Sequence, residues 1–133
     1  IQRMVRDLDF ATEVVVVPTV REPSGLAMSS RNAYLDAAER ERAAALNRAL
    51  AAAAATQVEG VDGALAAARE VLTRADIEPE YLEARYADDL GPARSFNGRP
   101  VLVAVAAQVG KARLIDNIVI DPVASAGTKR EQE

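Results

Sequence analysis

The chain has 133 residues, enough for one domain of ordinary size or for a small domain with a piece of another. Its net charge of −4 argues against a broad nucleic-acid-binding surface, which needs a basic face. The absence of cysteine and histidine excludes disulfides, a thiolate nucleophile, the commonest general base and the usual metal ligand.

The cellular location is inferred from segments that the sequence lacks. No apolar run approaches the roughly 18 residues that a membrane span needs. No basic stretch with an apolar core opens the chain, as it does in a secretory signal. These features favour a cytoplasmic protein without a membrane partner. The chain opens on Ile1 rather than Met, so we expect a processed chain or a fragment.

Residues 1–35 have the pattern of a helix, a short connection, a buried strand and a loop. Apolar residues recur with helical spacing over residues 1–8. The β-branched run Val14 to Val17 ends at Pro18, which predicts a parallel strand buried on both faces. A helix and a buried strand are half of an α/β repeat, and such a strand needs neighbours that this sequence does not supply. We therefore expect the chain to begin in the middle of a domain.

The loop after this strand contains the sequence "GLAMSSRNAYL". It follows the carboxyl end of the predicted strand, where open parallel sheets bind ligands. Serine hydroxyls, backbone N–H groups and the guanidinium of Arg31 could hold a phosphate. Alternatively, Ser29 or Ser30 caps a turn, Arg31 is solvated and Asn32 turns the chain. Residue types alone leave both interpretations open.

Residues 36–121 are predicted to form a compact α+β domain. Asp36 and Glu39 have the spacing of a capping box at the start of an alanine-rich helix over residues 37–56. A second helix follows over residues 60–76, and we expect the two helices to pair as a hairpin.

Three strands follow these helices. Residues 80–87 alternate apolar and polar side chains, residues 101–109 are strongly apolar, and residues 112–121 again alternate. Gly110 and Lys111 fit a two-residue hairpin turn between the last two strands. The expected fold is two helices on a small, mostly antiparallel three-stranded sheet, preceded by the last helix and strand of an α/β domain.

Two pairs of polar residues have possible functional roles, with Asp116 as a metal ligand or a base and the pair Asp88 and Asp89 as a cation site. Asp116 and Asn117 interrupt the last strand, and the favoured interpretation is a carboxylate bonded to nearby backbone or to an arginine rather than to a metal. Asp88 and Asp89 fit a solvated turn better than a cation site. Residues 122–133 show no periodicity, so we expect a disordered tail.

Several segments together resemble one enzyme family. The sequence "VPTVREPSGLAMSSRNAYL", the alanine-rich helix, "YLEARYADDL" and "RLIDNI" occur in the order typical of pantothenate synthetase, the pantoate–β-alanine ligase family. The resemblance covers nearly the whole chain. It implies a Rossmann-like nucleotidyltransferase domain that ends with the ATP loop in residues 1–35. It further implies that residues 36–121 form a smaller C-terminal lid domain.

The resemblance also implies an activity and partners. Members use ATP and Mg²⁺ to convert pantoate to pantoyl adenylate, and the amine of β-alanine then displaces AMP to give pantothenate. Full-length members are commonly homodimers. By motif, Met28, Ser29, Ser30 and Arg31 resemble the ATP-binding loop, with Met28 near the adenosine and the other three at the phosphates. Val20 resembles the residue whose backbone meets the adenine edge.

Other parts of the family pattern are missing from this chain. The "HxGH" histidines, the pantoate-binding glutamine and the "KD" lysine would lie upstream of residue 1. We therefore expect no catalytic residue in this chain and no activity from it alone. The alternative hypothesis is a non-catalytic module, derived from the lid domain, that binds an anion or a partner.

Overall fold

The computed structural model describes residues 1–122, so all but the first residue of the predicted tail lies outside the described residues. In chain order the elements are the helices α1 (Gln2–Asp7), η1 (Ser30–Tyr34), α2 (Ala37–Ala43), α3 (Ala45–Ala55), η2 (Gln57–Glu59) and α4 (Gly60–Arg74), and the strands β1 (Pro79–Tyr86), β2 (Val101–Val109) and β3 (Ala112–Ile120). No helix in this part of the chain is long and apolar enough to cross a membrane.

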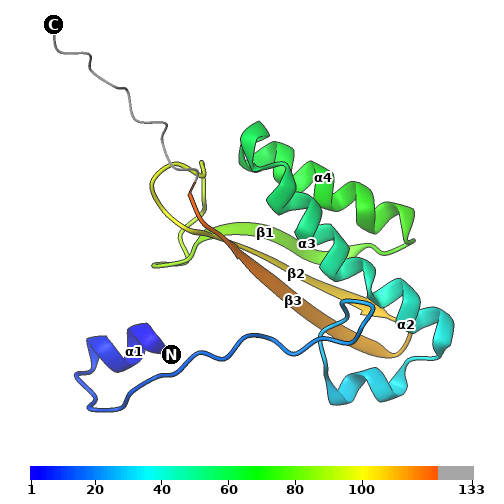
Figure 1. Cartoon of the computed structure of the whole chain (residues 1–133), viewed down its shortest axis with the longest axis horizontal. Coiled ribbons are helices and arrows are strands. Elements are labelled where there is room, and N and C mark those ends of the chain that lie inside the picture. Colours follow the sequence, from blue (N-terminus) through cyan, green and yellow to red (C-terminus); the bar gives the residue numbers. More distant parts are fainter. Residues whose placement is uncertain (123–133) are drawn as a thin grey trace, which may run out of the picture.

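The three strands form one sheet in the order β1-β2-β3, and both pairings are antiparallel. The helices α3 and α4 lie side by side on one face of the sheet (Figure 1). The predicted arrangement of helices on a three-stranded sheet is therefore confirmed, and the sheet is wholly antiparallel. The hairpin turn between β2 and β3 contains Gly110 with a φ of +54°, as the predicted two-residue turn requires.

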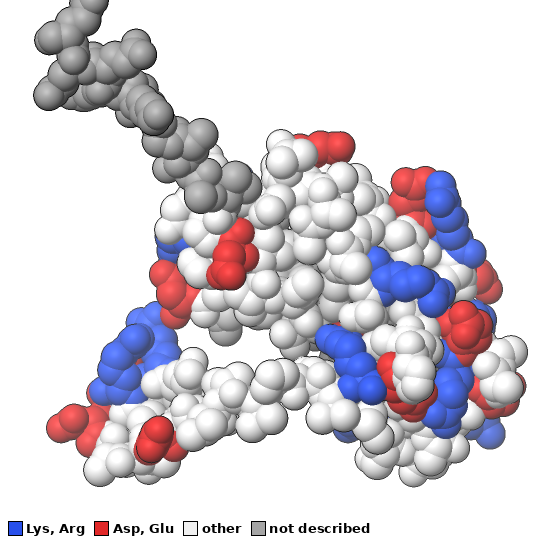
Figure 2. All heavy atoms as spheres, viewed as in Figure 1, with Lys and Arg blue, Asp and Glu red and all other residues white. Residues whose placement is uncertain are grey.

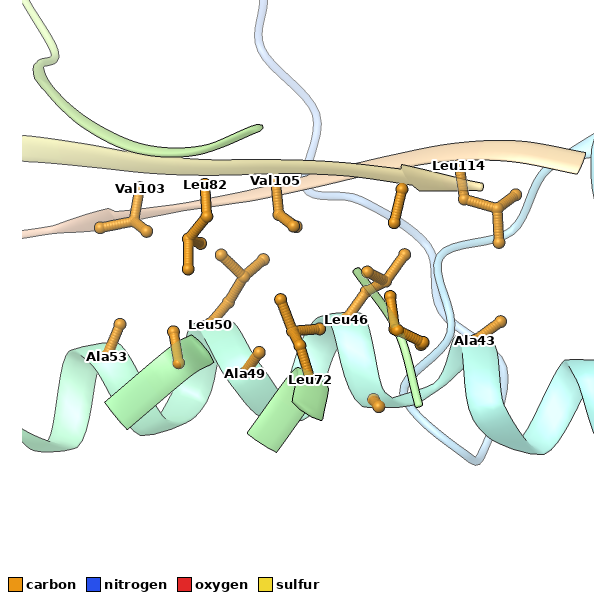
Figure 3. Packing of buried hydrophobic residues seen from close by; sticks show 14 of the residues in the cluster. Ala43, Leu46, Ala49, Leu50, Ala53, Leu72, Leu82, Val103, Val105 and Leu114 are labelled. Carbon is orange, nitrogen blue, oxygen red and sulfur yellow. The ribbon is translucent and has the colours of Figure 1, made fainter. Parts of the chain in front are cut away.

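The core lies between α3, α4 and the sheet. Leucines on the helices point toward valines on the inner face of the sheet (Figure 3). Buried alanines at every fourth position of α3 let the helix approach the sheet closely, which suits a chain with 28 alanines. The labelled side chains in this view are Ala43, Leu46, Ala49, Leu50, Ala53, Leu72, Leu82, Val103, Val105 and Leu114.

The alanine-rich helix differs from its prediction in one detail. Its predicted start is confirmed, because Asp36 and Glu39 form the full capping box of α2. The expected single helix is divided at Ala44 into α2 and α3. The N–H of Ala44 still donates to the carbonyl of Arg40, so this point is an irregularity rather than a turn between separate helices.

The strand predicted at Val14 to Val17 is not seen in this structure. Residues 11–20 form no strand, and Val15, Val16 and Val17 are 73%, 71% and 73% exposed. The helix α1 exists as predicted, but it has no buried residue. A β-branched run favours extended backbone, yet a parallel strand also needs hydrogen-bonded neighbours on its edges. No described strand lies beside this segment, so the Rossmann-like arrangement is not seen.

Candidate functional site

The loop that carries the predicted site is a small hairpin. The N–H of Met28 donates to the carbonyl of Val20 at 2.9 Å, and the N–H of Glu22 donates to the carbonyl of Leu26 at 2.8 Å. At the tip, Gly25 has a φ of +90°, a conformation that favours glycine. Val20 and Met28, the two residues predicted to lie near the adenosine, are therefore adjacent at the base of one hairpin.

An ion pair ties this hairpin to the sheet. Arg21 Nη1 lies 2.6 Å from Asp116 Oδ2, and Arg21 Nη2 lies 3.0 Å from Asp116 Oδ1. Arg21 Nη1 also donates to the carbonyl of Gly25 at 3.1 Å. The hydrogen bond and the charge of Asp116 raise the pKa of Arg21, against a smaller opposing effect of burial. The favoured interpretation of Asp116 as the partner of an arginine is confirmed.

A second network holds the other side of the loop. Arg40 of α2 donates to Glu22 Oε1 at 2.7 Å and to the carbonyl of Asn32 at 3.0 Å. The buried amide of Asn32 donates to the carbonyl of Ala27 at 3.0 Å. The hairpin and η1 are thus fastened to α2 and β3 by charge-assisted hydrogen bonds, which are stronger than neutral ones.

The serine-arginine segment follows the hairpin directly. Ser29 Oγ accepts a hydrogen bond from the N–H of Arg31, so Ser29 caps η1. This is the capped turn that sequence analysis gave as the alternative to a phosphate site. Ser29, Ser30 and Arg31 are all exposed. The guanidinium of Arg31 makes no hydrogen bond or ion pair with any of residues 1–122. Capping therefore leaves this guanidinium available to a ligand.

A pocket of about 390 Å³ lies between this segment and the edge strand β3. It is lined by Leu26, Ala27, Met28, Ser29, Arg31, Leu46, Arg113, Leu114, Ile115 and Asp116. The structure thus brings together three of the predicted site residues, Met28, Ser29 and Arg31. Val20 and Ser30 do not line this pocket.

Charge on the molecule is mixed around this region. Basic and acidic side chains alternate over the α2 end in the face that Figure 2 shows, and the extended segment before the hairpin is mostly uncharged. At the other end of the sheet, both Asp88 and Asp89 pair with Arg99, whose guanidinium lies 3.9 Å from the centre of the Tyr86 ring. The guanidinium of Arg99 therefore offsets part of the negative charge of the aspartate pair.

The acidic side chains of the described residues form no cluster of metal ligands. Among residues 1–122, no group of three or more acidic side chains could hold a metal ion. Asp116 is the acidic residue that lines the pocket, and Arg21 occupies both of its oxygens. The donor set at the pocket consists of guanidinium and hydroxyl groups, which suit an anion.

Sequence analysis missed several residues of this site. Arg21, Glu22 and Arg40 hold the loop, and Arg113 lines the pocket. Arg21 and Glu22 lie inside the ordered "PTVREPSGLAMSSRN" motif, and Arg113 opens "RLIDN". Their position in these motifs was a signal that they belong to the site. Their partners could not be read from the sequence, because the pairs join residues up to 95 positions apart.

Comparisons with known proteins identify similar chains. The family model described as Pantoate-beta-alanine ligase matches residues 1–119. Pantothenate synthetase 4 of Frankia alni is 55% identical over 119 residues, which cover 89% of this chain and 38% of that protein. Pantothenate synthetase of Nocardia farcinica is 53% identical over 121 residues, which cover 90% of this chain and 37% of that protein.

Solved structures agree with these matches. The crystal structure of pantothenate synthetase from Thermus thermophilus has a TM-score of 0.80 at 42% identity and covers 91% of this chain and 45% of that chain. The pantoate-beta-alanine ligase from Francisella tularensis, complexed with beta-gamma ATP and beta-alanine, has a TM-score of 0.56 at 24% identity and shares the fold. The match covers 89% of this chain and 37% of the Francisella chain. This chain thus spans about two-fifths of the length of the curated relatives named above.

Proposed function

The chain belongs to the pantoate–β-alanine ligase family, and from this membership we propose that it is part of an enzyme that joins pantoate and β-alanine with ATP. The observation that carries the proposal is the pocket between the hairpin and β3. Met28, Ser29 and Arg31 line it together, and Arg31 presents a guanidinium without a protein partner among residues 1–122.

We propose that the hairpin and the serine-arginine segment form the ATP loop. Met28 would pack near the adenosine, and the backbone of Val20 would meet the adenine edge. The hydrogen bond between these two residues supports a shared nucleoside-binding position. Ser29, Ser30 and Arg31 would hold the phosphates. Residues 1–35 would end the nucleotide-binding domain, and residues 36–121 would form the C-terminal domain.

The proposed reaction has two steps. The pantoate carboxylate attacks the α-phosphorus of ATP, and the bond to the β-phosphate oxygen breaks, so pyrophosphate leaves with the electron pair. The amine of β-alanine then attacks the acyl carbon, loses a proton and displaces AMP. Negative charge builds on pyrophosphate in the first step, and hydroxyl and guanidinium donors stabilise such charge.

Several parts of the proposal depend on residues outside this chain. The catalytic histidines are expected upstream, so we propose that the 133-residue chain alone is inactive. Mg²⁺ stays a predicted cofactor, and it would be held mainly by ATP phosphates because the described acidic residues offer no cluster for it. A homodimer and a cytoplasmic location also stay predictions for the longer protein.

The test is a chimera in which this chain replaces the matching segment of the Frankia alni relative. We expect pantothenate and AMP to form, and Arg31→Gln to lower the rate on the order of 100-fold because a phosphate donor is lost. Arg69→Gln is the matched control, since Arg69 lies on α4 and pairs only loosely with Glu78 at 3.9 Å. A well-folded chimera that makes no pantothenate would favour the non-catalytic module instead.

A further inference from the structure

We propose that Asn32 is a positioning residue, which closes the loop of residues 27–32 and so holds Ser29 and Arg31 in the geometry that the phosphates of the nucleotide require. This inference rests on the proposed function, because it adds a residue that acts through the donors of the same loop. Asn32 itself would not touch the nucleotide, since it is 4% exposed and does not line the pocket.

The side-chain amide of Asn32 closes the loop at its two ends. Its Nδ2 atom donates to the carbonyl of Ala27 at 3.0 Å and to Glu22 Oε1 at 3.3 Å. The reverse orientation of the amide would put Oδ1 against these two acceptors, so the atom that faces them is the donor. The hydrogen bond to Ala27 therefore joins the ends of a loop whose inner residues, 28–31, carry the proposed phosphate donors.

The backbone of Asn32 connects this loop to α2. Its N–H donates to the carbonyl of Ser29 at 3.0 Å, and its carbonyl accepts from Arg40 Nη2 of α2 at 3.0 Å. Arg40 Nη1 also donates at 2.7 Å to Glu22 Oε1, the oxygen that the amide of Asn32 contacts. Arg40 thus fixes Asn32, and Asn32 fixes both ends of the loop.

The proposed donors have no other anchor of this kind. Ser29, Ser30 and Arg31 are exposed, and in the described chain no hydrogen bond joins them to the sheet or to α2, α3 or α4. Their position therefore depends on the hydrogen bonds at the ends of the loop, including that of Asn32. A displacement of about 1 Å in a catalytic site can cost on the order of 100-fold in rate, so the loss of this hydrogen bond should be measurable.

The experiment measures the two proposed steps separately in the chimera with the Frankia alni relative. The value of kcat/KM for ATP reports the first step, and kcat/KM for β-alanine reports the second, because pyrophosphate leaves before β-alanine reacts. We expect Asn32→Ala to lower kcat/KM for ATP about tenfold and to leave kcat/KM for β-alanine unchanged. A loss of folded enzyme would instead lower both values equally.

A double variant tests whether Asn32 acts through Arg31. Because Arg31→Gln already removes the guanidinium, adding Asn32→Ala should lower kcat/KM for ATP by no more than about threefold further. If Asn32→Ala does not fold, Asn32→Asp takes its place, since a carboxylate of the same shape accepts hydrogen bonds but does not donate them.

The matched control is Thr56→Val. It deletes the hydrogen bond from Thr56 Oγ1 to the carbonyl of Ala52 at the end of α3, outside the loop and the pocket, and should leave both values unchanged.

The outcomes separate the two proposals. The inference about Asn32 is overturned, and the ATP loop stands, if Arg31→Gln lowers kcat/KM for ATP but Asn32→Ala behaves like Thr56→Val. The same holds if Asn32→Ala lowers both kcat/KM values equally, or if its full effect adds to that of Arg31→Gln. If Arg31→Gln leaves kcat/KM for ATP unchanged, the ATP loop and the role of Asn32 are both overturned.

Discussion

The ion pair between Arg21 and Asp116 is expected to be the main anchor of the hairpin. The carboxylate of Asp116 is 5% exposed and the side chain of Arg21 is 27% exposed. Removing one partner from a buried pair leaves an uncompensated charge, which costs far more than an exposed pair contributes. The two single substitutions should therefore differ, because the two partners differ in their access to water.

The expected losses follow from this difference in exposure. Arg21→Met leaves a buried carboxylate whose remaining donor is the N–H of Asn117, and it should lower the free energy of unfolding by about 3 kcal/mol. Asp116→Leu leaves a guanidinium that can turn toward water, so its cost should be about 2 kcal/mol. The double variant replaces the pair by apolar groups and should lose only about 1 kcal/mol.

Urea denaturation followed by far-UV circular dichroism measures these values. Hydrogen exchange at the Met28 amide, which donates to Val20, measures whether the hairpin loosens. Exchange should be faster in Arg21→Met. The control is Arg85→Met, which breaks an exposed pair and should cost no more than about 1 kcal/mol. Equal losses in Arg21→Met and the control, or additive losses in the double variant, would refute the reasoning.

Two further predictions concern a glycine and an aspartate. Gly25→Ala should lower the free energy of unfolding by about 2 kcal/mol in urea denaturation, because φ is +90° and the new Cβ would lie 2.5 Å from Asn47 Nδ2. The control is Gly98→Ala, because Gly98 has a similar φ of +79° but no atom within 4 Å of the new Cβ. An equal loss of stability in the two variants would contradict the role of the contact with Asn47. Hydrogen bonds from Arg99 lower the pKa of Asp88. These bonds therefore stabilise the fold fully above the ordinary carboxyl pKa, and this stabilisation is lost as the pH falls through the lowered pKa of Asp88. Arg99→Gln should raise that pKa toward its ordinary value in a ¹³C NMR titration, and an unchanged pKa would disprove the assignment.

Local sequence patterns predicted the features that depend on neighbouring residues. The capping box needs only Asp36 and Glu39, and the alternation in residues 112–121 correctly put Leu114 and Asp116 on one face. The irregularity at Ala44 was not predictable, because the surrounding alanine-rich sequence has a uniformly high helix propensity.

Features that depend on distant partners were predicted less well. Sequence analysis expected an arginine partner for Asp116, but it could not select Arg21 from 95 residues away. The run Val14 to Val17 was assigned to a buried strand from the preference of its residues for extended backbone. The strand is not seen, and the neighbours that sequence analysis had already found to be missing are the physical reason. Met28, Ser29 and Arg31 were proposed as site residues through a motif, whereas their common pocket with β3 became visible only in the fold.

The contacts of the loop bear on how the proposed site would work. Leu26 and Leu35 belong to the same buried cluster as Leu46 and Leu50 of α3. Together with the pair of Arg21 with Asp116, these contacts make residues 20–35 part of the same packed unit as α3 and the sheet, although the proposed division places them in the preceding domain. The proposed phosphate donors would then move as one body with β3. Any displacement of β3 relative to a nucleotide would shift Ser29 and Arg31 with it, so these proposed donors would meet or leave the phosphates together.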